Sequence, residues 1–289
     1  MKIRNARALV LALGVLTSVT QRAQASLNIV GYANVPVAAG YNLIANPFDN
    51  TTNTLNPLLT NAPDGSLVFL WNTTNQSFTA PSIFQLGIGW DLNYDISPGK
   101  GFMVWSPVAW TNTFVGTVLQ GTLTTFVAGT NKLSLLGDKL PIAGSLATNH
   151  LFPLIDSASV YVFSTATQGY LDAFSSFNGF GWFDPKGVAD TNGPNINVGQ
   201  GFFVQNPGAD TNWTKTFTPL VGPTGPPITS FGLSGDKVVL KISNAGAPYN
   251  VQFSTDRISW HTVATNQTSD VWTGPNLHGL QGYYQTVNP

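Results

Sequence analysis

The sequence predicts an all-β fold, and three features of its 289 residues carry that prediction. All 13 acidic residues are Asp, so the strong helix former Glu is absent. The 29 Gly and 19 Pro residues, together with abundant Asn and Thr, favour turns. Between these turns lie short runs in which apolar and polar residues alternate, as in half-buried strands, and no long amphipathic helix is visible.

The first 25 residues are set apart from the fold. Lys2, Arg4 and Arg7 precede an apolar run from Ala8 to Val15, and the chain then reaches the small-x-small sequence Ala23–Ala25. This order is typical of a signal peptide cleaved near Ala25, so we expect a secreted or cell-surface protein. No later apolar segment is long enough to predict a transmembrane helix.

Charge and cysteine content restrict the partners and the means of stabilisation. Removal of the signal peptide leaves eight of the 12 basic residues against 13 acidic ones, a formal charge near −5. The acidic residues are scattered and no basic stripe exists, which argues against nucleic acid and anionic membranes as partners. Because there is no cysteine, the exported chain cannot use disulfides and depends on its core, for which 43% hydrophobic residues suffice.

The chain contains an internal repeat. The stretch Ile96–Pro107 (ISPGKGFMVWSP) returns as Ile196–Pro207 (INVGQGFFVQNP), at an offset of 100 residues. Three further matches keep the same order, namely Ala62–Leu70 with Leu154–Val162 and Gly87–Trp90 with Gly179–Trp182, both at offset 92, and Trp110–Phe114 with Trp213–Phe217, at offset 103. Four ordered matches indicate a duplicated unit of about ninety residues.

Each repeat reads as a series of short strands separated by Gly and Pro. In the first repeat we expect strands at Ile29–Val37, Tyr41–Ala45, Leu67–Trp71, Phe102–Trp105 and Trp110–Val118, with one helical turn over Asn53–Leu59. Beyond a Pro/Gly linker, strand-like runs at Lys237–Ile242, Tyr249–Ser254, Trp260–Val263 and Tyr283–Val287 predict a small β-sandwich.

The predicted organisation is a signal peptide (1–25), two β modules (26–118 and 119–221), a linker (222–227) and the sandwich (228–289). The sequence leaves open whether the two modules form one pseudo-symmetric unit or two domains.

The repeated Gly-x-Gly motif predicts a turn that leads into a strand. In Gly99–Gly101 and Gly199–Gly201 the two glycines allow positive φ, and the residues that follow alternate between a buried and an outer face. A phosphate-binding loop would need Gly-Lys-Ser/Thr at the start of a helix, and Lys100 is replaced by Gln200 in the second copy. The motif therefore indicates architecture and not chemistry.

Two resemblances rest on these segments. Tyr41–Pro47 and Pro98–Val104 resemble a "G-[FW]-N-L-I-S-x-P … G-x-G-[FY]-[FW]-V" repeat of uncharacterised secreted and surface proteins of bacteria and archaea. The match covers most of residues 28–218, although it is degraded at Leu133–Gly137. Residues Tyr249–Asp256 with Trp260–Val263 are similar to fibronectin type III-like modules of exported bacterial proteins, although the module looks short. Both resemblances imply an exported, modular β protein and bring no active site.

Catalytic motifs are largely missing from the sequence. The three histidines, His150, His261 and His278, lack metal-ligand spacing, and no Gly-x-Ser-x-Gly elbow occurs. A glycoside hydrolase would need two carboxylates, for which Asp91 and Asp95 are the nearest candidates, followed by Asp184 and Asp190. All four lie in turn-rich stretches where Asp caps turns, so no catalytic residue and no cofactor is predicted.

Asp190, Asn192 and Asn195 place several oxygen ligands on one loop of the second repeat and form a weak calcium candidate. The spacing does not match an EF-hand, because the glycine comes too early and the terminal Glu is missing.

The tryptophans supply the candidate ligand-binding residues. Trp90/Trp182 and Trp110/Trp213 recur at equivalent positions and are expected to serve the fold. Trp71 and Trp105 become Phe163 and Gln205 in the second repeat, so no shared fold requirement fixes them. They are the candidates for a ligand-binding face, against the alternative that they belong to the core.

The leading interpretation is an exported, non-enzymatic structural or adhesion protein of the cell surface or extracellular space. Its partners would be polysaccharides or other surface proteins. The competing interpretations are a carbohydrate-binding protein that uses Trp71 or Trp105 and an Asp-dependent glycoside hydrolase.

Overall fold

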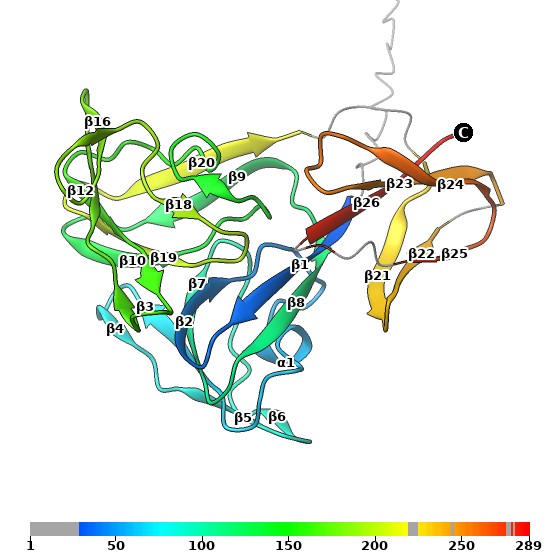
Figure 1. The fold of residues 1–289 in the computed structure, drawn as a ribbon, viewed down its shortest axis with the longest axis horizontal. Coiled ribbons are helices and arrows are strands. Elements are labelled where there is room, and N and C mark those ends of the chain that lie inside the picture. The colour runs from blue at the N-terminus through cyan, green and yellow to red at the C-terminus, as the bar shows by residue number, and fades with distance from the viewer. Residues whose placement is uncertain (1–28, 219–224, 244–245, 276–278, 280) are drawn as a thin grey trace, which may run out of the picture.

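A computed structural model describes residues 29–218, 225–243, 246–275, 279 and 281–289. The predicted signal peptide and residues 222–224 of the predicted linker lie outside them. The described chain is nearly all-β, which confirms the predicted fold class (Figure 1). Within it the only α-helix, α1 (Leu55–Leu58), is a single turn in the segment where one was expected. No helix in these ranges is long and apolar enough to cross a membrane.

The first repeat forms a mixed-length antiparallel sheet and a separate strand pair. Its strands are β1 (Val30–Val37), β2 (Gly40–Ala45), β3 (Leu67–Asn72), β4 (Ser77–Phe78), β5 (Ser82–Gln85), β6 (Gly89–Trp90), β7 (Gly101–Ser106) and β8 (Trp110–Thr117). The sheet has the order β2-β7-β3-β5-β6 with β4 attached to β3, while β1 pairs with β8. Phe102 and Val104 of β7 are fully buried on one face, as their alternation predicts, and Met103 points to the other.

The second repeat builds the same arrangement again. Its strands are β9 (Gly121–Val127), β10 (Lys132–Leu136), β11 (Gly144–Ser145), β12 (Ala158–Tyr161), β13 (Phe163–Ser164), β14 (Gly169–Tyr170), β15 (Phe174–Phe177), β16 (Gly181–Phe183), β17 (Ala189–Asp190), β18 (Asn195–Ile196), β19 (Phe202–Asn206) and β20 (Thr211–Phe217). The sheet order β10-β19-β12-β15-β16-β17 repeats that of the first module, and β9 pairs with β20 as β1 does with β8.

The C-terminal segment completes a sandwich with help from the first repeat. It contains β21 (Ile228–Ser234), β22 (Lys237–Ile242), β23 (Tyr249–Ser254), β24 (His261–Gln267), β25 (Val271–Pro275) and β26 (Gln281–Val287). One sheet is β21-β22-β25, and the other is β24-β23-β26-β1-β8, in which β26 lies beside β1 (Figure 1). Val30 and Tyr32 of β1 enter the core of this sandwich, whereas Ala33 and Val35 face the core of the first module. This strand sharing explains why residues 228–289 look short for a complete module.

The repeated Gly-x-Gly turns join the two modules to each other. The N–H of Ala45 at the end of β2 donates to the carbonyl of Gly199 (2.8 Å), in the turn before β19. In the equivalent contact the N–H of Gly137, after β10, donates to the carbonyl of Gly99 (3.1 Å), in the turn before β7. Because both partners have the same positions in the repeat, the contact is isologous, as at a two-fold axis.

Only the first glycine of each motif is a turn glycine. Gly99 and Gly199 have φ of 97° and 70°, whereas Gly101 and Gly201 do not have positive φ. A Cβ on Gly101 would lie 2.7 Å from the carbonyl oxygen of Leu136, and one on Gly201 would lie 3.0 Å from a backbone carbonyl of β2. The expectation of positive φ at both glycines is therefore wrong for the second, which is small because the other module's backbone packs against it.

Two glutamines close this interface. Gln76 lies between β3 and β4, where its Oε1 accepts the N–H of Leu133 (2.7 Å) and its Nε2 donates to the Leu133 carbonyl (3.1 Å). Gln168, between β13 and β14, makes the same two bonds to Tyr41 (2.7 and 3.2 Å). Each amide pairs with an edge strand of the other module as a further strand would. The two repeats thus pack as one pseudo-symmetric unit.

Candidate functional site: an aromatic trough between the modules

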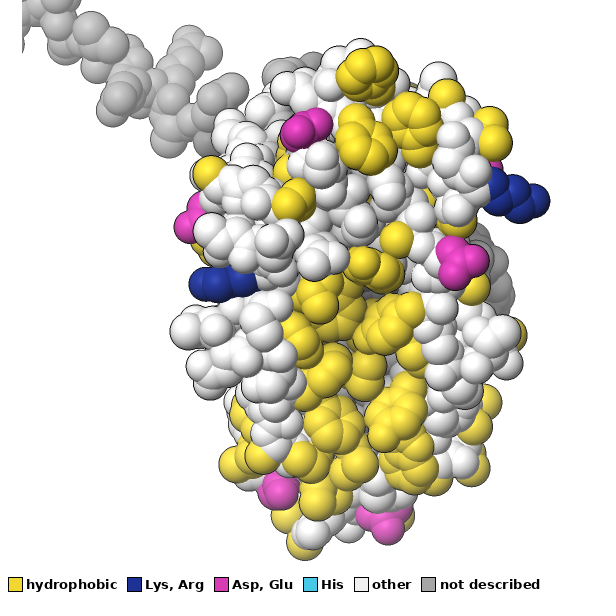
Figure 2. All heavy atoms as spheres, turned by 90° about the vertical axis from the view of Figure 1, so that its left-hand side faces the viewer, with side chains coloured by type: hydrophobic (Ala, Val, Ile, Leu, Met, Phe, Trp, Pro, Cys, Tyr) yellow, Lys and Arg dark blue, Asp and Glu magenta, His cyan; other side chains and the backbone are white. Residues whose placement is uncertain are grey.

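An apolar trough crosses the interface between the two modules. We call it the aromatic trough; its floor consists of the buried residues Leu43, Met103, Leu135 and Phe203, and its sides of the half-buried residues Phe69, Trp71, Phe78, Leu133, Tyr161 and Phe163. Figure 2 shows apolar side chains gathered in a hollowed band on this side of the molecule, with mainly uncharged polar atoms along both flanks.

The floor follows from the symmetry of the repeat. Leu43 on β2 and Leu135 on β10 are equivalent residues at offset 92, and Met103 on β7 and Phe203 on β19 are equivalent at offset 100. In each module these strands direct alternate residues into the module's own core and away from it. The two outward faces meet because the turns and glutamines bind β2 to the second module and β10 to the first.

Two equivalent aromatic pairs lie beside the floor, one on the β3–β4 hairpin and one on the β13–β14 hairpin. Trp71 packs edge-to-face on Phe78, with ring centroids 5.0 Å apart, and Phe163 packs in the same way on Tyr170 at 5.3 Å. The ring of Phe203 lies 4.9 Å from Trp71 and 5.8 Å from Tyr170, so rings of both hairpins meet over it. The ring planes are inclined at 67–84° in these four contacts.

One end of the trough opens into a cavity of about 410 Å³. It is lined by Trp71, Phe78, Leu133, Tyr161, Tyr170, Phe203 and Gln205. The hydroxyl of Tyr161 donates to Oε1 of Gln205 (3.2 Å), and burial raises the pKa of Tyr170. A mostly apolar lining with a few polar groups is typical of small-ligand pockets.

The two tryptophans proposed from the sequence lie in different surroundings. Trp71 lines the cavity, but its indole N–H is bonded to the Leu133 carbonyl (2.8 Å), so this side chain also holds the modules together. Trp105 is half-buried on β7, opposite Tyr41 and Leu67, and does not line the cavity. Its equivalent in the second repeat, Gln205, is the residue that does.

The first pair of hydrolase candidates is engaged in turns. Asp91 accepts the N–H of Ile83 (2.7 Å) and of Leu92 (2.7 Å), and the bond from Ile83 contributes most to lowering the pKa of Asp91. Burial alone would raise the pKa of Asp95, but hydrogen bonds from Lys100 and from the N–H and hydroxyl of Ser97 outweigh it and lower the pKa. Both carboxylates are satisfied as turn caps.

Asp184 and the calcium candidates are also engaged locally. Asp184 accepts the N–H groups of Lys186 (2.9 Å) and Val188 (2.8 Å), and Asp190 accepts the N–H of Asn192 (2.8 Å). The Asn192 carbonyl already accepts the Ser145 hydroxyl and the Ala147 N–H, while Asn195 is exposed in β18 and pairs with Ser145. Among the described residues no three His, Cys, Asp or Glu side chains are grouped as for a metal ion.

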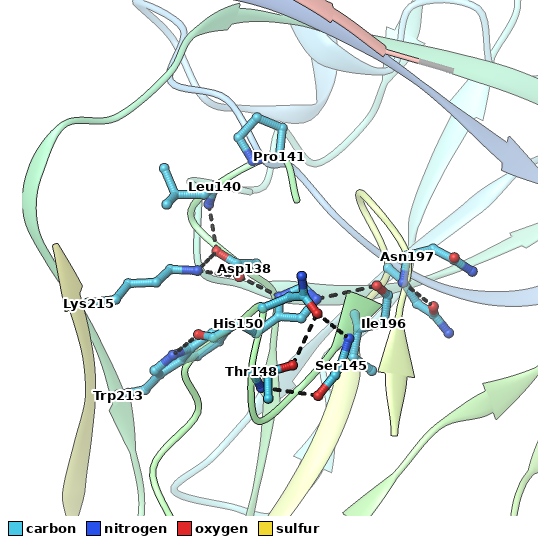
Figure 3. A network of polar contacts seen from close by, with 12 residues as sticks. Asp138, Leu140, Pro141, Ser145, Thr148, His150, Ile196, Asn197, Trp213 and Lys215 are labelled. Atoms are coloured by element: carbon cyan, nitrogen blue, oxygen red, sulfur yellow. Dashed lines mark hydrogen bonds and ion pairs between the residues drawn. The ribbon is translucent and has the colours of Figure 1, made fainter. Parts of the chain in front are cut away.

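The histidines divide between surface and core. His261 is exposed at the start of β24, and His278 lies outside the described residues. His150 is completely buried, and its Nδ1 lies 2.6 Å from Oδ2 of Asp138 (Figure 3). Asp138 in turn forms a buried ion pair with Lys215 of β20. We call these three residues the buried charge cluster.

The sequence interpretation missed this cluster, although the repeat carries a signal for it. Asp138 is equivalent to Asn46 at offset 92, and Lys215 is equivalent to Asn112 at offset 103. Both asparagines are buried, so the second repeat places two opposite charges where the first has two neutral amides. A charge introduced at an inward position of a strand is rarely tolerated without a partner.

Comparison of the sequence with models of known protein families and with curated proteins returns no match.

Proposed function

We propose that this chain is an exported, non-enzymatic adhesion protein that binds apolar side chains of a partner polypeptide in the aromatic trough. The observation that carries the proposal is the pre-formed trough itself, held open by reciprocal bonds between two modules and lined by aromatic rings. Surfaces that bind proteins are enriched in Tyr, Trp, Phe and Met and depleted of charge at their centre.

The ring geometry supports a polypeptide partner. The rings stand at 67–84° to one another and form recesses between them, whereas a sugar needs an exposed flat face on which to stack. Apolar side chains that enter such recesses displace water from aromatic walls on several sides, as at the hot spots of protein interfaces.

Carbohydrate binding is the second candidate, and one observation favours it. The cavity combines the rings of Trp71 and Tyr170 with the hydroxyl of Tyr161 and the amide of Gln205, which could bond sugar hydroxyls. The Asp-dependent hydrolase has the least support, because Asp91, Asp95 and Asp184 cap turns.

Selection of phage-displayed random peptides on the immobilised protein tests the proposal. We expect enriched peptides to carry aromatic or aliphatic anchors and to bind a Tyr170→Ala variant about tenfold more weakly, as for loss of a hot-spot residue. Phe180→Ala is the matched control, because Phe180 is an aromatic residue of the same module that is 81% exposed outside the trough. Equal losses for both variants, or no enrichment, would contradict the proposal.

A parallel assay uses insoluble polysaccharides, with calcium and with EDTA. Retention on one polysaccharide that disappears in Gln205→Ala, without peptide enrichment, would replace the proposal with carbohydrate binding. Retention that EDTA abolishes would direct attention to Asp190, Asn192 and Asn195.

A further inference from the structure

The buried charge cluster brings an amine and a carboxyl group of distant segments into direct contact. Lys215 and Asp138 are 77 residues apart in the chain, and Nζ of Lys215 contacts both carboxylate oxygens of Asp138. The side chains are only 5% and 6% exposed. Removing both ions from water is unfavourable, and their attraction offsets this only with excellent geometry.

The carboxyl group is bound on three sides. Oδ1 accepts the N–H of Leu140 (2.7 Å), and Oδ2 lies 2.6 Å from Nδ1 of His150 (Figure 3). Nε2 of His150 faces the carbonyl of Ile196 (3.3 Å), which can only accept, so Nε2 carries a proton. Nδ1 and Oδ2 are then close enough for a proton to pass between them.

The amine lies in apolar surroundings. Nζ of Lys215 is 4.9 Å from the ring centre of Trp213, and burial lowers the pKa of Lys215 against the opposing effect of Asp138. Arg257 of the C-terminal segment, between the rings of Phe217 and Tyr283, adds a further positive charge that lowers this pKa. A desolvated, neutral lysine is a nucleophile.

We propose that Lys215 and Asp138 condense into an amide, so that an isopeptide crosslink ties β20 to the segment after β10. Nζ attacks Cγ of Asp138 and forms the C–N bond, while the N–H of Leu140 stabilises the negative charge that develops on Oδ1. The ammonium of Lys215 passes one proton to Oδ2 before the attack and loses a second as the amide forms. The C–Oδ2 bond breaks, and both protons leave with Oδ2 as water. His150 transfers one of them through Nδ1. The reaction needs no oxidant and no cofactor.

The repeat supplies an internal comparison for this chemistry. In the first module Asn46 keeps the bond to a backbone N–H, from Phe48 to its Oδ1 (3.1 Å), which mirrors the bond from Leu140 to Asp138. The amine is replaced by the side-chain amide of Asn112, which is no nucleophile. The second module alone therefore combines amine, acid and proton carrier. In a chain without cysteine, this crosslink would close a long loop as a disulfide does elsewhere.

Mass spectrometry of the purified chain tests the proposal. We expect the intact mass to fall below the sequence mass by one water molecule, and proteolysis to yield a branched peptide that joins residue 138 to residue 215. The deficit should vanish in Lys215→Arg and remain in Lys186→Arg, the matched change at an exposed lysine of the same module. His150→Ala should slow formation of the branched peptide.

The wild-type protein by itself can overturn the proposal, so the test does not depend on whether a variant folds. A folded wild-type chain with the full sequence mass and separate peptides around residues 138 and 215 would overturn it. A succinimide at Asp64-Gly65 would cause the same deficit, but it hydrolyses in mild alkali and persists in Lys215→Arg, and that result would also overturn the proposal.

Discussion

At the scale of one residue, Gly101 explains why both copies of the Gly-x-Gly motif keep their second glycine. A Cβ at this position would lie 2.7 Å from a carbonyl oxygen and 2.9 Å from the Leu135 side chain of the other module. We expect Gly101→Ala to lower the free energy of unfolding by about 1–3 kcal/mol or more through overpacking. Chemical denaturation followed by tryptophan fluorescence measures this change.

Gly232 provides the matched control for Gly101. It lies in β21 without positive φ, and a Cβ there would meet nothing within 4 Å. Gly232→Ala should change the free energy of unfolding by less than about 1 kcal/mol. Equal effects of the two substitutions would contradict the close approach of the modules.

Asp91 predicts a pH dependence with a definite sign. Its folded pKa is lowered below the ordinary value of 3.8, mainly by the N–H of Ile83, so the ionised carboxylate stabilises the fold above pH 3.8. This contribution is lost as the pH falls through the folded pKa. Asp91→Ala should therefore be less stable than the wild type at pH 6, and the difference should shrink below about pH 3.8.

Denaturant titrations of both proteins between pH 6 and pH 2.5 measure that difference. A stability gap that stays constant over the whole range would show that the carboxylate of Asp91 is not the group responsible.

At the scale of elements, the five strands that the sequence predicted in the first repeat each lie within one residue of the observed bounds, and two of the C-terminal strands match theirs. Period-two alternation located β1, β2, β3, β7, β8, β22 and β23, because each has one face in a core. The two-residue strands such as β4 and β6 were not predicted, because two residues are too few to show an alternating pattern. The pairing of β26 with β1 was not predicted either. Alternation of apolar and polar residues shows which face of a strand is buried, but it does not show which strand lies beside it.

The shared strand β1 makes the C-terminal segment part of the first module's fold. Removal of residues 228–289 would uncover Val30 and Tyr32, which are 3% and 0% exposed, and leave the edge of β1 unpaired. We expect the chain truncated after residue 227 to aggregate or to lose cooperative unfolding. Size-exclusion chromatography with light scattering checks this. A monomeric truncated chain of unchanged thermal midpoint would contradict it.

At the scale of the whole molecule, the site was only partly predictable. Trp71 was proposed because the second repeat has Phe163 in its place, and Trp71 does lie in the trough. Trp105 was proposed for the same reason, but it does not line the cavity. The sequence interpretation missed Tyr170, Phe203 and Gln205. An offset of 92 or 100 residues identifies equivalent positions in the two repeats, but it does not show how the two repeats pack against each other. The contact between Asp138 and Lys215 depends on the same packing.

The two repeats bind each other reciprocally and so form one unit with the trough between them. Amide hydrogen exchange at Tyr41 and Leu133, measured by NMR, tests it most directly, because these N–H groups donate to Gln168 and Gln76. Both should exchange slowly in the wild type. Gln168→Ala should speed exchange about tenfold or more at Tyr41 and leave Leu133 protected, and Gln76→Ala should do the reverse. Fast exchange at both sites in the wild type would contradict this reciprocal packing of the two repeats.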